Sequence, residues 1–360
     1  MHTIKDLGPL THPMAVNDAG QVVGYADIDI TGHIHHAFFW DSGNLINLDD
    51  NWPPHTEAAF SVNKDGQVVG STALISDLTP STGLLAFFCG EPLANNPTLL
   101  PLDKVTSIAR GINKLSAIVG HRQLPGERWQ PVYWPSYKDL PTLLASTQPG
   151  LGGKAAAINE HGVIVGRASV DNIGNFVGCL WRTFQDPPQR LEPPPGFPQS
   201  YAWAVNDNGP VEGNVRPSVV GIYGPGVANG ENPIERLMKP IRYGCRWDPV
   251  PDKGEWKYAV KPLFSSLVNS FAFGINKTGD MVGTFFDPLV VDPKDLLKGQ
   301  RAFYSASDWP QPLDLTNFIE NNPGWTLKVA RGINKHGQIV GEGIIKGQTQ
   351  THGFLLTPAR

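Results

Sequence analysis

The sequence predicts an all-β fold, a seven-bladed β-propeller with four antiparallel strands in each blade. Two observations lead to this prediction. The chain repeats one short segment seven times, and a strand that the last repeat lacks is found at the N-terminus. The composition agrees with it, because 39 glycines and 33 prolines among 360 residues are typical of a chain with many turns.

Each copy of the repeated segment has an apolar residue, then asparagine, and a glycine seven positions after that asparagine. The seven copies lie at 14–24, 60–70, 110–120, 156–166, 203–213, 273–283 and 331–341. A strand, then Asn-x-x-Gly, then a strand describes a tight β-hairpin, in which Asn hydrogen-bonds its own turn and Gly adopts a positive φ. The third copy has Ser116 at that glycine position, so we expect backbone strain there.

Two further strand-like segments follow each hairpin. The first is short and aromatic, at 35–41, 85–90, 130–135, 176–181, 242–247, 301–305 and 352–356. The second is leucine-rich and closes six of the repeats, at 45–48, 99–102, 140–144, 189–193, 259–263 and 311–315. The seventh repeat has none, but residues 4–10 match the pattern. We therefore expect an N-terminal strand at 2–10 to complete the seventh blade and to close the ring, which hides the sheet edges.

The repeats differ in length, which predicts loop insertions within one propeller domain of residues 1–360. The larger insertions are expected between second and third strands, at 214–241 and 284–300, with others between the fourth strand and the next first strand. The turns between first and second strands are all expected to be tight. The variable connections should share one rim of the ring, and binding groups usually lie on such loops over a rigid scaffold.

These segments resemble a known family. The form Ile-Asn-x-x-Gly-x-x-Val-Gly, followed by Ala-Phe-x-Trp and a leucine-rich strand, is similar to the HAF-type repeats of many bacterial proteins, often described as extracellular. The resemblance covers nearly the whole chain and rests on all seven copies. It implies a repeat β fold and carries over no catalytic residue.

Charge and cysteine content narrow the classes of function and location. The net charge is −4 and no basic run occurs, so neither a nucleic-acid nor a membrane partner is expected. The N-terminus has no signal peptide, which predicts a cytoplasmic protein and leaves a secreted mature form open. The three cysteines, Cys89, Cys179 and Cys245, have no CxxC spacing, so we expect buried thiols.

The motif search predicts neither a metal nor a cofactor. The three histidines of HIHH at 33–36 lack the further ligands that a metal site needs, and are interpreted as the entry to an aromatic strand. The glycine-rich stretches at 152–154 and 224–230 do not have the spacing of phosphate or dinucleotide loops. No GxSxG or HExxH occurs.

The first strand of each repeat has one uniform face and one variable face. Two and four positions before the Asn, every copy has a small residue, which suits the crowded axis of a ring. Three positions before it stand Met14, Phe60, Arg110, Ala156, Trp203, Phe273 and Arg331. Five positions before it stand His12, Ala58, Ile108, Lys154, Tyr201, Phe271 and Val329. The variable side chains are candidates for lining a central channel.

Arg110 and Arg331 stand at equivalent positions and predict an anion site, because guanidinium groups hold a carboxylate or phosphate by paired hydrogen bonds. The alternative is an arginine that stacks on an aromatic ring of the next blade or pairs with an acidic neighbour. The predicted ligand-binding residues are Arg110, Arg331, Trp203, Lys154, Phe60, Phe273 and His121, with Arg167 and Glu342 as neighbours.

Three functions of different kinds remain open, since propellers host all of them. The first is a binding protein for a small, partly apolar, anionic ligand at the mouth of the central channel. The second is a metal-independent enzyme of the lyase, isomerase or cyclase type, in which Tyr201, His12 or Glu57 would transfer protons while the arginines stabilise negative charge. The third is a protein-interaction scaffold. The oligomeric state does not follow from these residues.

Overall fold

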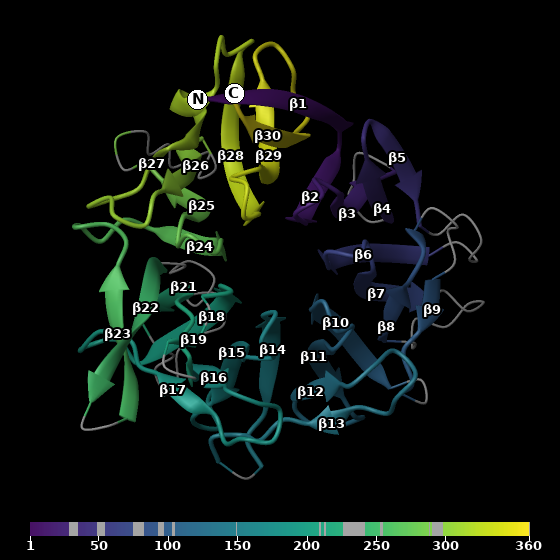
Figure 1. Cartoon of the computed structure of the whole chain (residues 1–360), viewed down its shortest axis with the longest axis vertical. Helices are drawn as coiled ribbons and strands as arrows, with labels where there is room; N and C mark the ends of the chain where they lie inside the picture. The colour runs from purple at the N-terminus through teal and green to yellow at the C-terminus, as the bar shows by residue number, and fades with distance from the viewer. Residues whose placement is uncertain are drawn as a thin grey trace.

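Seven antiparallel four-stranded sheets stand around a central axis in the computed structural model, which is a β-propeller (Figure 1). This confirms the predicted fold class. The structure describes residues 1–28, 35–48, 55–74, 83–92, 97–102, 105–148, 150–208, 210–211, 214–225, 242–252, 255–287, 289 and 298–359.

The first four blades follow one another along the chain, each beginning with its innermost strand (Figure 1). Blade 1 contains β2 (Thr11–Val16), β3 (Val22–Asp27), β4 (His35–Asp41) and β5 (Asn44–Asn47). Blade 2 contains β6 (His55–Val62), β7 (Val68–Leu74), β8 (Leu84–Cys89) and β9 (Pro97–Leu99). Blade 3 contains β10 (Thr106–Ile112), β11 (Ile118–Gln123), β12 (Gln130–Trp134) and β13 (Thr142–Leu143). Blade 4 contains β14 (Gly153–Ile158), β15 (Ile164–Ser169), β16 (Phe176–Trp181) and β17 (Gln189–Leu191).

The last three blades carry the departures from the simple repeat. Blade 5 contains β18 (Gln199–Val205), β21 (Val219–Gly224), β22 (Tyr243–Asp252) and β23 (Glu255–Pro262), with a small extra hairpin of β19 (Pro210–Val211) and β20 (Asn214–Val215). Blade 6 contains β24 (Ser270–Ile275), β25 (Met281–Phe286), β26 (Gln300–Ser305) and β27 (Leu313–Asp314), and the 3-10 turn η3 (Leu315–Phe318) follows it. Blade 7 contains β28 (Trp325–Ile333), β29 (Ile339–Ile345), β30 (His352–Pro358) and β1 (His2–Pro9).

The N-terminal strand closes the ring. β1 pairs antiparallel with β30, from His2 opposite Pro358 to Pro9 opposite His352, so the two chain ends meet in blade 7 (Figure 1). Leu7 of β1 is 7% exposed and packs in one apolar cluster with Phe38 of blade 1 and Leu355 of blade 7. The predicted completion of the last blade by this strand is therefore confirmed.

The repeated asparagine organises its own turn, as predicted, and also links neighbouring blades. The Oδ1 of Asn63 accepts hydrogen bonds from the backbone N–H groups of Asp65 and Gln67, both at 3.0 Å. Its Nδ2 donates to the carbonyl oxygen of Asn113 in the next blade, at 3.0 Å. Ser116 adopts a φ of 61° at the glycine position of the third turn, which confirms the strained copy.

Cross-blade bonds of this kind form an almost complete ring. The donor and acceptor asparagines are Asn17 and Asn63, Asn63 and Asn113, Asn113 and Asn159, Asn159 and Asn206, Asn276 and Asn334, and Asn334 and Asn17. The buried Nδ2 of Asn206 has no hydrogen-bond partner in the described part of the chain, so the ring opens between blades 5 and 6.

The fifth repeat is paired differently from the prediction, which took Gly213 as the second Gly of the repeat and placed the second strand around it. The structure uses Val219–Gly224, with Gly221 opposite Ala202. At Gly221 a Cβ would collide with the Tyr201 carbonyl oxygen, so this glycine takes the place of the repeat's second Gly. The predicted strand would have buried Glu212 where other copies have valine, and an unpaired buried charge is costly. The alternative at 218–221 buries Val219 and Val220 completely.

Two predicted details of the insertions are corrected by this pairing. The turn between the first and second strands of blade 5 is not tight, because it spans the residues between Val205 and Val219 and contains the β19–β20 hairpin. The predicted insertion at 214–241 includes β20 and β21, and its residues 226–241 lie outside the described part of the chain. The first residues of the predicted insertion at 284–300 belong to β25, and residues 288 and 290–297 lie outside the description.

The core lies between blades and is built from the aromatic third strands. Trp134, Trp181 and Trp247 are fully buried there. The cysteines Cys89, Cys179 and Cys245 are buried thiols in the same layers, as expected. Burial raises the pKa of Cys179 to about 12, so the thiol stays protonated at neutral pH. In the described part of the chain, no helix has the length and apolar character needed to cross a membrane.

Candidate functional site

A β-bulge in every innermost strand aims the variable residue at the central channel. The register shifts at the same place in all seven blades, between Pro13/Ala15, Ala59/Ser61, Ala109/Gly111, Ala155/Ala157, Ala202/Ala204, Ala272/Gly274 and Ala330/Gly332. The residue inside each bulge is the variable one, namely Met14, Phe60, Arg110, Ala156, Trp203, Phe273 or Arg331. All of these residues line one cavity of about 430 Å³, which we call the channel cavity. Bulges of this kind re-aim side chains near functional sites.

The small residues next to the bulges suit the narrow axis, as predicted, because the blades approach closely there. A Cβ on Gly111 would lie 3.1 Å from the backbone nitrogen of Ile158 in the next blade. A Cβ on Gly332 would lie 3.4 Å from the Cα of Ala15. These positions therefore set how closely the blades approach and contribute no chemistry.

Arg331 lies in the channel cavity and is paired with a carboxylate. Its Nε donates to the Oε1 of Glu342 at 2.9 Å. The Oε2 of Glu342 lies 3.0 Å from the Nδ1 of His12, whose Nε2 lies 3.0 Å from the Asp27 carboxylate. Burial alone would raise the pKa of Glu342, but the contacts with His12 and Arg331 outweigh burial and lower it. Arg331 therefore pairs with an acidic neighbour, which was one of the alternatives to an anion site.

Arg110 occupies the same position in blade 3 with different surroundings. Its Cζ lies 4.1 Å from the ring centroid of Phe60 in blade 2. Among the described residues, no carboxylate lies within ion-pair distance of its guanidinium group. Burial lowers the pKa of Arg110, although the group stays charged. Arg110 therefore stacks on an aromatic ring, as one of the two alternatives predicted. No carboxylate of the described residues pairs with its charge.

Two more cations stand beside Arg110, and we call the three residues the cation cluster. Lys154 and Arg167 are opposite each other on β14 and β15 of blade 4. The Cζ of Arg167 lies 4.1 Å from the ring centroid of Phe176 and 4.5 Å from that of Tyr201. Its buried Nε has no hydrogen-bond partner among the residues that the structure describes.

Lys154 completes the cation cluster. Its Nζ lies 4.3 Å from the ring centroid of Trp129. Burial, together with the charges of Arg167 and Arg110, lowers the pKa of Lys154 to about 8. No carboxylate in the described ranges forms an ion pair with Lys154 or Arg167.

His121 and Tyr201 lie within the electric field of this cluster. Burial and the charges of Lys154 and Arg110 lower the pKa of His121 to about 2, so its imidazole is neutral at physiological pH. Burial raises the pKa of Tyr201, which keeps its hydroxyl protonated even though Arg167 and Arg110 oppose the shift. The ring of Tyr201 lies 4.1 Å from that of Trp203, so an aromatic wall faces the cations.

A second cavity, which we call the rim cavity, lies between blades 3 and 4 and contains two members of the cation cluster, Lys154 and Arg167. It measures about 430 Å³ and is lined by Trp129, Lys154, Arg167, Phe176 and neighbouring residues that include Arg128 and Glu127. A smaller cavity of about 110 Å³ contains Arg167 and Tyr201. Arg167 therefore lines two cavities, and Tyr201 joins the smaller cavity to the channel cavity.

The structure brings some predicted site residues together and separates others. Phe60, Arg110, Tyr201, Trp203, Phe273 and Arg331 line the channel cavity, whereas Lys154 lines the rim cavity. His12 lies in blade 1, is held between two carboxylates and lines neither cavity. Glu57 belongs to β6, but its side chain lies outside the described part of the protein.

Sequence reasoning named Arg167 only as a neighbour, although it is central to the cluster. The signal was available, because Arg167 directly follows the second Gly of its repeat and lies opposite Lys154 in a hairpin. Residues that lie opposite each other on paired strands share one face of the sheet, so the hairpin pattern predicts that Lys154 and Arg167 lie side by side.

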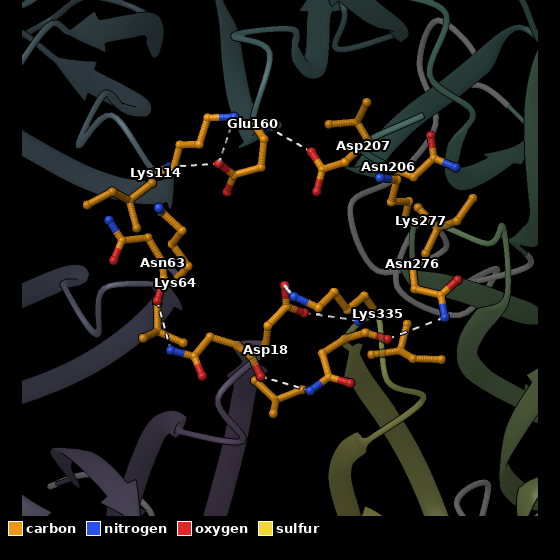
Figure 2. A pocket seen from close by; sticks show the side chains of 18 of the residues that line it. Asp18, Asn63, Lys64, Lys114, Glu160, Asn206, Asp207, Asn276, Lys277 and Lys335 are labelled. Atoms are coloured by element: carbon orange, nitrogen blue, oxygen red, sulfur yellow. Dashed lines mark hydrogen bonds and ion pairs between the residues drawn. The ribbon is translucent and has the colours of Figure 1, made fainter. Parts of the chain in front are cut away.

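The opposite mouth of the channel has a different character (Figure 2). A cavity of about 440 Å³ is lined there by five of the repeated asparagines and by charged residues that follow the repeat asparagine. Lys335 pairs with Asp18 at 2.9 Å, and Lys114 lies 3.9 Å from Glu160. The backbone N–H of Glu160 donates to Asp207 at 2.8 Å. Three acids and four lysines line this mouth in the described part of the chain, so opposite charges offset one another there, unlike in the cation cluster.

Comparison with known proteins supports the β-propeller fold. No protein-family model matches the sequence, and no curated protein matches it. A solved structure from an analysis of two prolyl endopeptidases superimposes with a TM-score of 0.56 at 10% identity, covering 100% of this chain and 50% of that one. The chain thus spans about half the length of that endopeptidase. A structure of YCF48 bound to D1 peptide superimposes with a TM-score of 0.51 at 10% identity, covering 100% and 95% of the two chains. Identity this low supports the β-propeller fold alone, and the HAF resemblance stays a prediction.

Proposed function

We propose that the protein binds a small, partly apolar anion between the channel cavity and the rim cavity, with its negative group at Arg110, Lys154 and Arg167. The observation that carries this proposal is geometric: Lys154 and Arg167 are cross-strand partners in the rim cavity, Arg167 contacts Tyr201 of the channel cavity that Arg110 lines, and none of the three has a carboxylate partner among the described residues. Buried charges in proteins are normally paired, so such a cluster favours an anion from outside the chain.

The surrounding groups suit the apolar part of such a ligand. Trp203 and Phe273 line the channel cavity beside Tyr201, and their rings lie 6.0 Å apart. The indole Nε1 of Trp203 is buried and has no hydrogen-bond partner in the described ranges. A volume of about 430 Å³ is typical of small-molecule sites, which combine apolar walls with a few polar groups.

The test compares two arginines at the same position of the repeat. Sulfate, benzoate and phenyl phosphate are titrated into the parent, R110Q, R167Q and R331Q, and binding is measured by calorimetry and by the shift in melting temperature. We expect the anions to bind the parent and R331Q. R110Q and R167Q should bind them with an affinity lower by about tenfold or more, which corresponds to a loss of about 1.4 kcal/mol or more in binding free energy. R331Q is the matched control because Glu342 already neutralises Arg331.

Two outcomes would contradict the proposal. One is that none of the three anions binds the parent, which would favour a protein-interaction scaffold. The other is that R110Q and R167Q bind as well as the parent. Chemical conversion of a bound ligand would instead favour the enzyme alternative, in which the protonated Tyr201 hydroxyl is the available acid of the channel cavity.

A further inference from the structure

Lys154 and Arg167 form a matched pair in the rim cavity. They are Cα partners on adjacent strands, so their side chains leave the same face of the sheet with Cβ atoms about 5 Å apart. Both line the rim cavity. Each is in contact with an aromatic ring, Lys154 with Trp129 and Arg167 with Phe176.

We propose that Lys154 is a nucleophilic amine that condenses with a 2-oxo acid whose carboxylate is held by Arg167. This inference rests on the proposed function, because the same cation cluster binds the carboxylate. In a 2-oxo acid the carbonyl carbon is bonded directly to the carboxylate carbon. A ligand anchored on Arg167 therefore presents its carbonyl to a neighbour at the spacing of one cross-strand pair.

The chemistry balances without any redox partner. The neutral Nζ of Lys154 adds to the carbonyl carbon and forms a carbinolamine. The carbinolamine takes up a proton and loses water, which leaves a protonated imine between Nζ and the former carbonyl carbon. Lysines activated by desolvation or by a neighbouring cation are known nucleophiles of this kind.

The charges around Lys154 favour the neutral amine. Arg167 on β15 and Arg110 on β10 face it, and His121 on β11 is neutral. Of the exposed groups at the rim cavity, Arg128 adds a positive charge, and Glu127 accepts a hydrogen bond from Gln130 at 2.9 Å. With a pKa of about 8, a sizeable fraction of Lys154 is unprotonated at pH 7.5, whereas ordinary lysines are almost fully charged.

The test traps the imine. The parent is incubated at pH 7.5 with pyruvate and sodium cyanoborohydride, which reduces an imine to a stable secondary amine, and the adducts are located by peptide mass spectrometry. Acetone, which has the ketone without the carboxylate, is the matched probe. The internal reference is Lys257, whose side chain is 70% exposed.

We expect pyruvate to label Lys154 about tenfold faster than acetone does, after each rate is normalised to Lys257. K154R, which keeps the charge, should give no adduct at this position, and R167Q should lose the preference for pyruvate. In the parent, sulfate should slow the labelling of Lys154 by pyruvate, because it competes for the same cations. This comparison needs no variant.

Labelling of Lys154 no faster than Lys257, or equal labelling by pyruvate and acetone, would overturn the inference. Sulfate binding without a pyruvate adduct overturns the inference and leaves the proposed function in place. A pyruvate-selective adduct in a protein that binds none of sulfate, benzoate and phenyl phosphate supports the amine chemistry and overturns the broader function.

Discussion

Arg110 and Arg331 occupy the same bulge of equivalent strands, yet among the described residues only Arg331 is held by a carboxylate, at 2.9 Å from Glu342. Arginine at the same position of two repeats thus has two physical roles. At one copy the guanidinium neutralises a buried acid, and at the other it joins two further cations. The difference lies in the residues beside each arginine: Glu342 of β29 in its own blade for Arg331, and Lys154 and Arg167 of the next blade for Arg110.

The two arginines should contribute differently to stability. R331Q leaves the mostly buried Glu342 with His12 as its remaining partner, and we expect a loss of about 2 kcal/mol in the free energy of unfolding. R110Q removes a charge that is repelled by its neighbours, so we expect a change of less than about 0.5 kcal/mol or a small gain. Urea unfolding of both variants at pH 7.5 and low salt checks this, and equal losses would refute the asymmetry.

The neutral His121 should make the protein sensitive to acid. Its pKa is near 2 in the folded state and near 6.5 when unfolded, so between these values only the unfolded state binds the proton. Stability from this group is present above pH 6.5 and falls as the pH falls, by about 1.4 kcal/mol per unit. H121Q should flatten the slope of unfolding free energy between pH 6.5 and 5.

H12Q is the control for this slope. Burial alone would lower the pKa of His12, but its bonds to Glu342 and Asp27 outweigh burial and raise it. Its contribution is therefore complete below pH 6.5 and is lost as the pH rises. H12Q should keep the acid slope and cost less stability at pH 9 than at pH 6. An acid slope unchanged in H121Q would show that His121 is not the group responsible.

The asparagine ring predicts unequal costs for the same substitution in different blades. N63A removes bonds to two turn N–H groups and the cross-blade bond to Asn113. N206A removes the bond from the Ser218 N–H at 2.8 Å and a longer one from Asn208, and it has no cross-blade bond to lose. We expect N63A to cost about 1–2 kcal/mol more than N206A in chemical denaturation. A larger loss for N206A would contradict the ring's role.

Ring closure by β1 should be visible in truncated chains. Deletion of residues 1–10 removes the strand paired with β30 and exposes an unpaired edge, so we expect a large fall in melting temperature and aggregation on heating. The milder L7A keeps the strand and removes one buried side chain, with an expected cost of about 2–4 kcal/mol. A melting temperature that the deletion leaves unchanged would refute closure by this strand.

The repeat pattern predicted most of the fold because its signals are local. The turn asparagine, the positive φ after it and the buried strand that follows all depend on residues within one hairpin. Blade 5 was misread for the same reason. Residues 211–213 and 219–221 both end in glycine after valine-containing stretches, and only burial against the neighbouring blades decides between them.

The sequence by itself determined the class of fold, the number of blades, the closure by the N-terminal strand and the identity of the side chains at the channel. These follow from periodicity, which a chain carries without any tertiary contact. Only the tertiary structure decided that Arg331 is neutralised, that Arg110, Lys154 and Arg167 gather without a described acid, and that His12 stands apart from them. The reason is that Coulomb interaction and desolvation depend on the distances between side chains, both within a blade and between blades, and these distances do not follow from the order of residues along the chain.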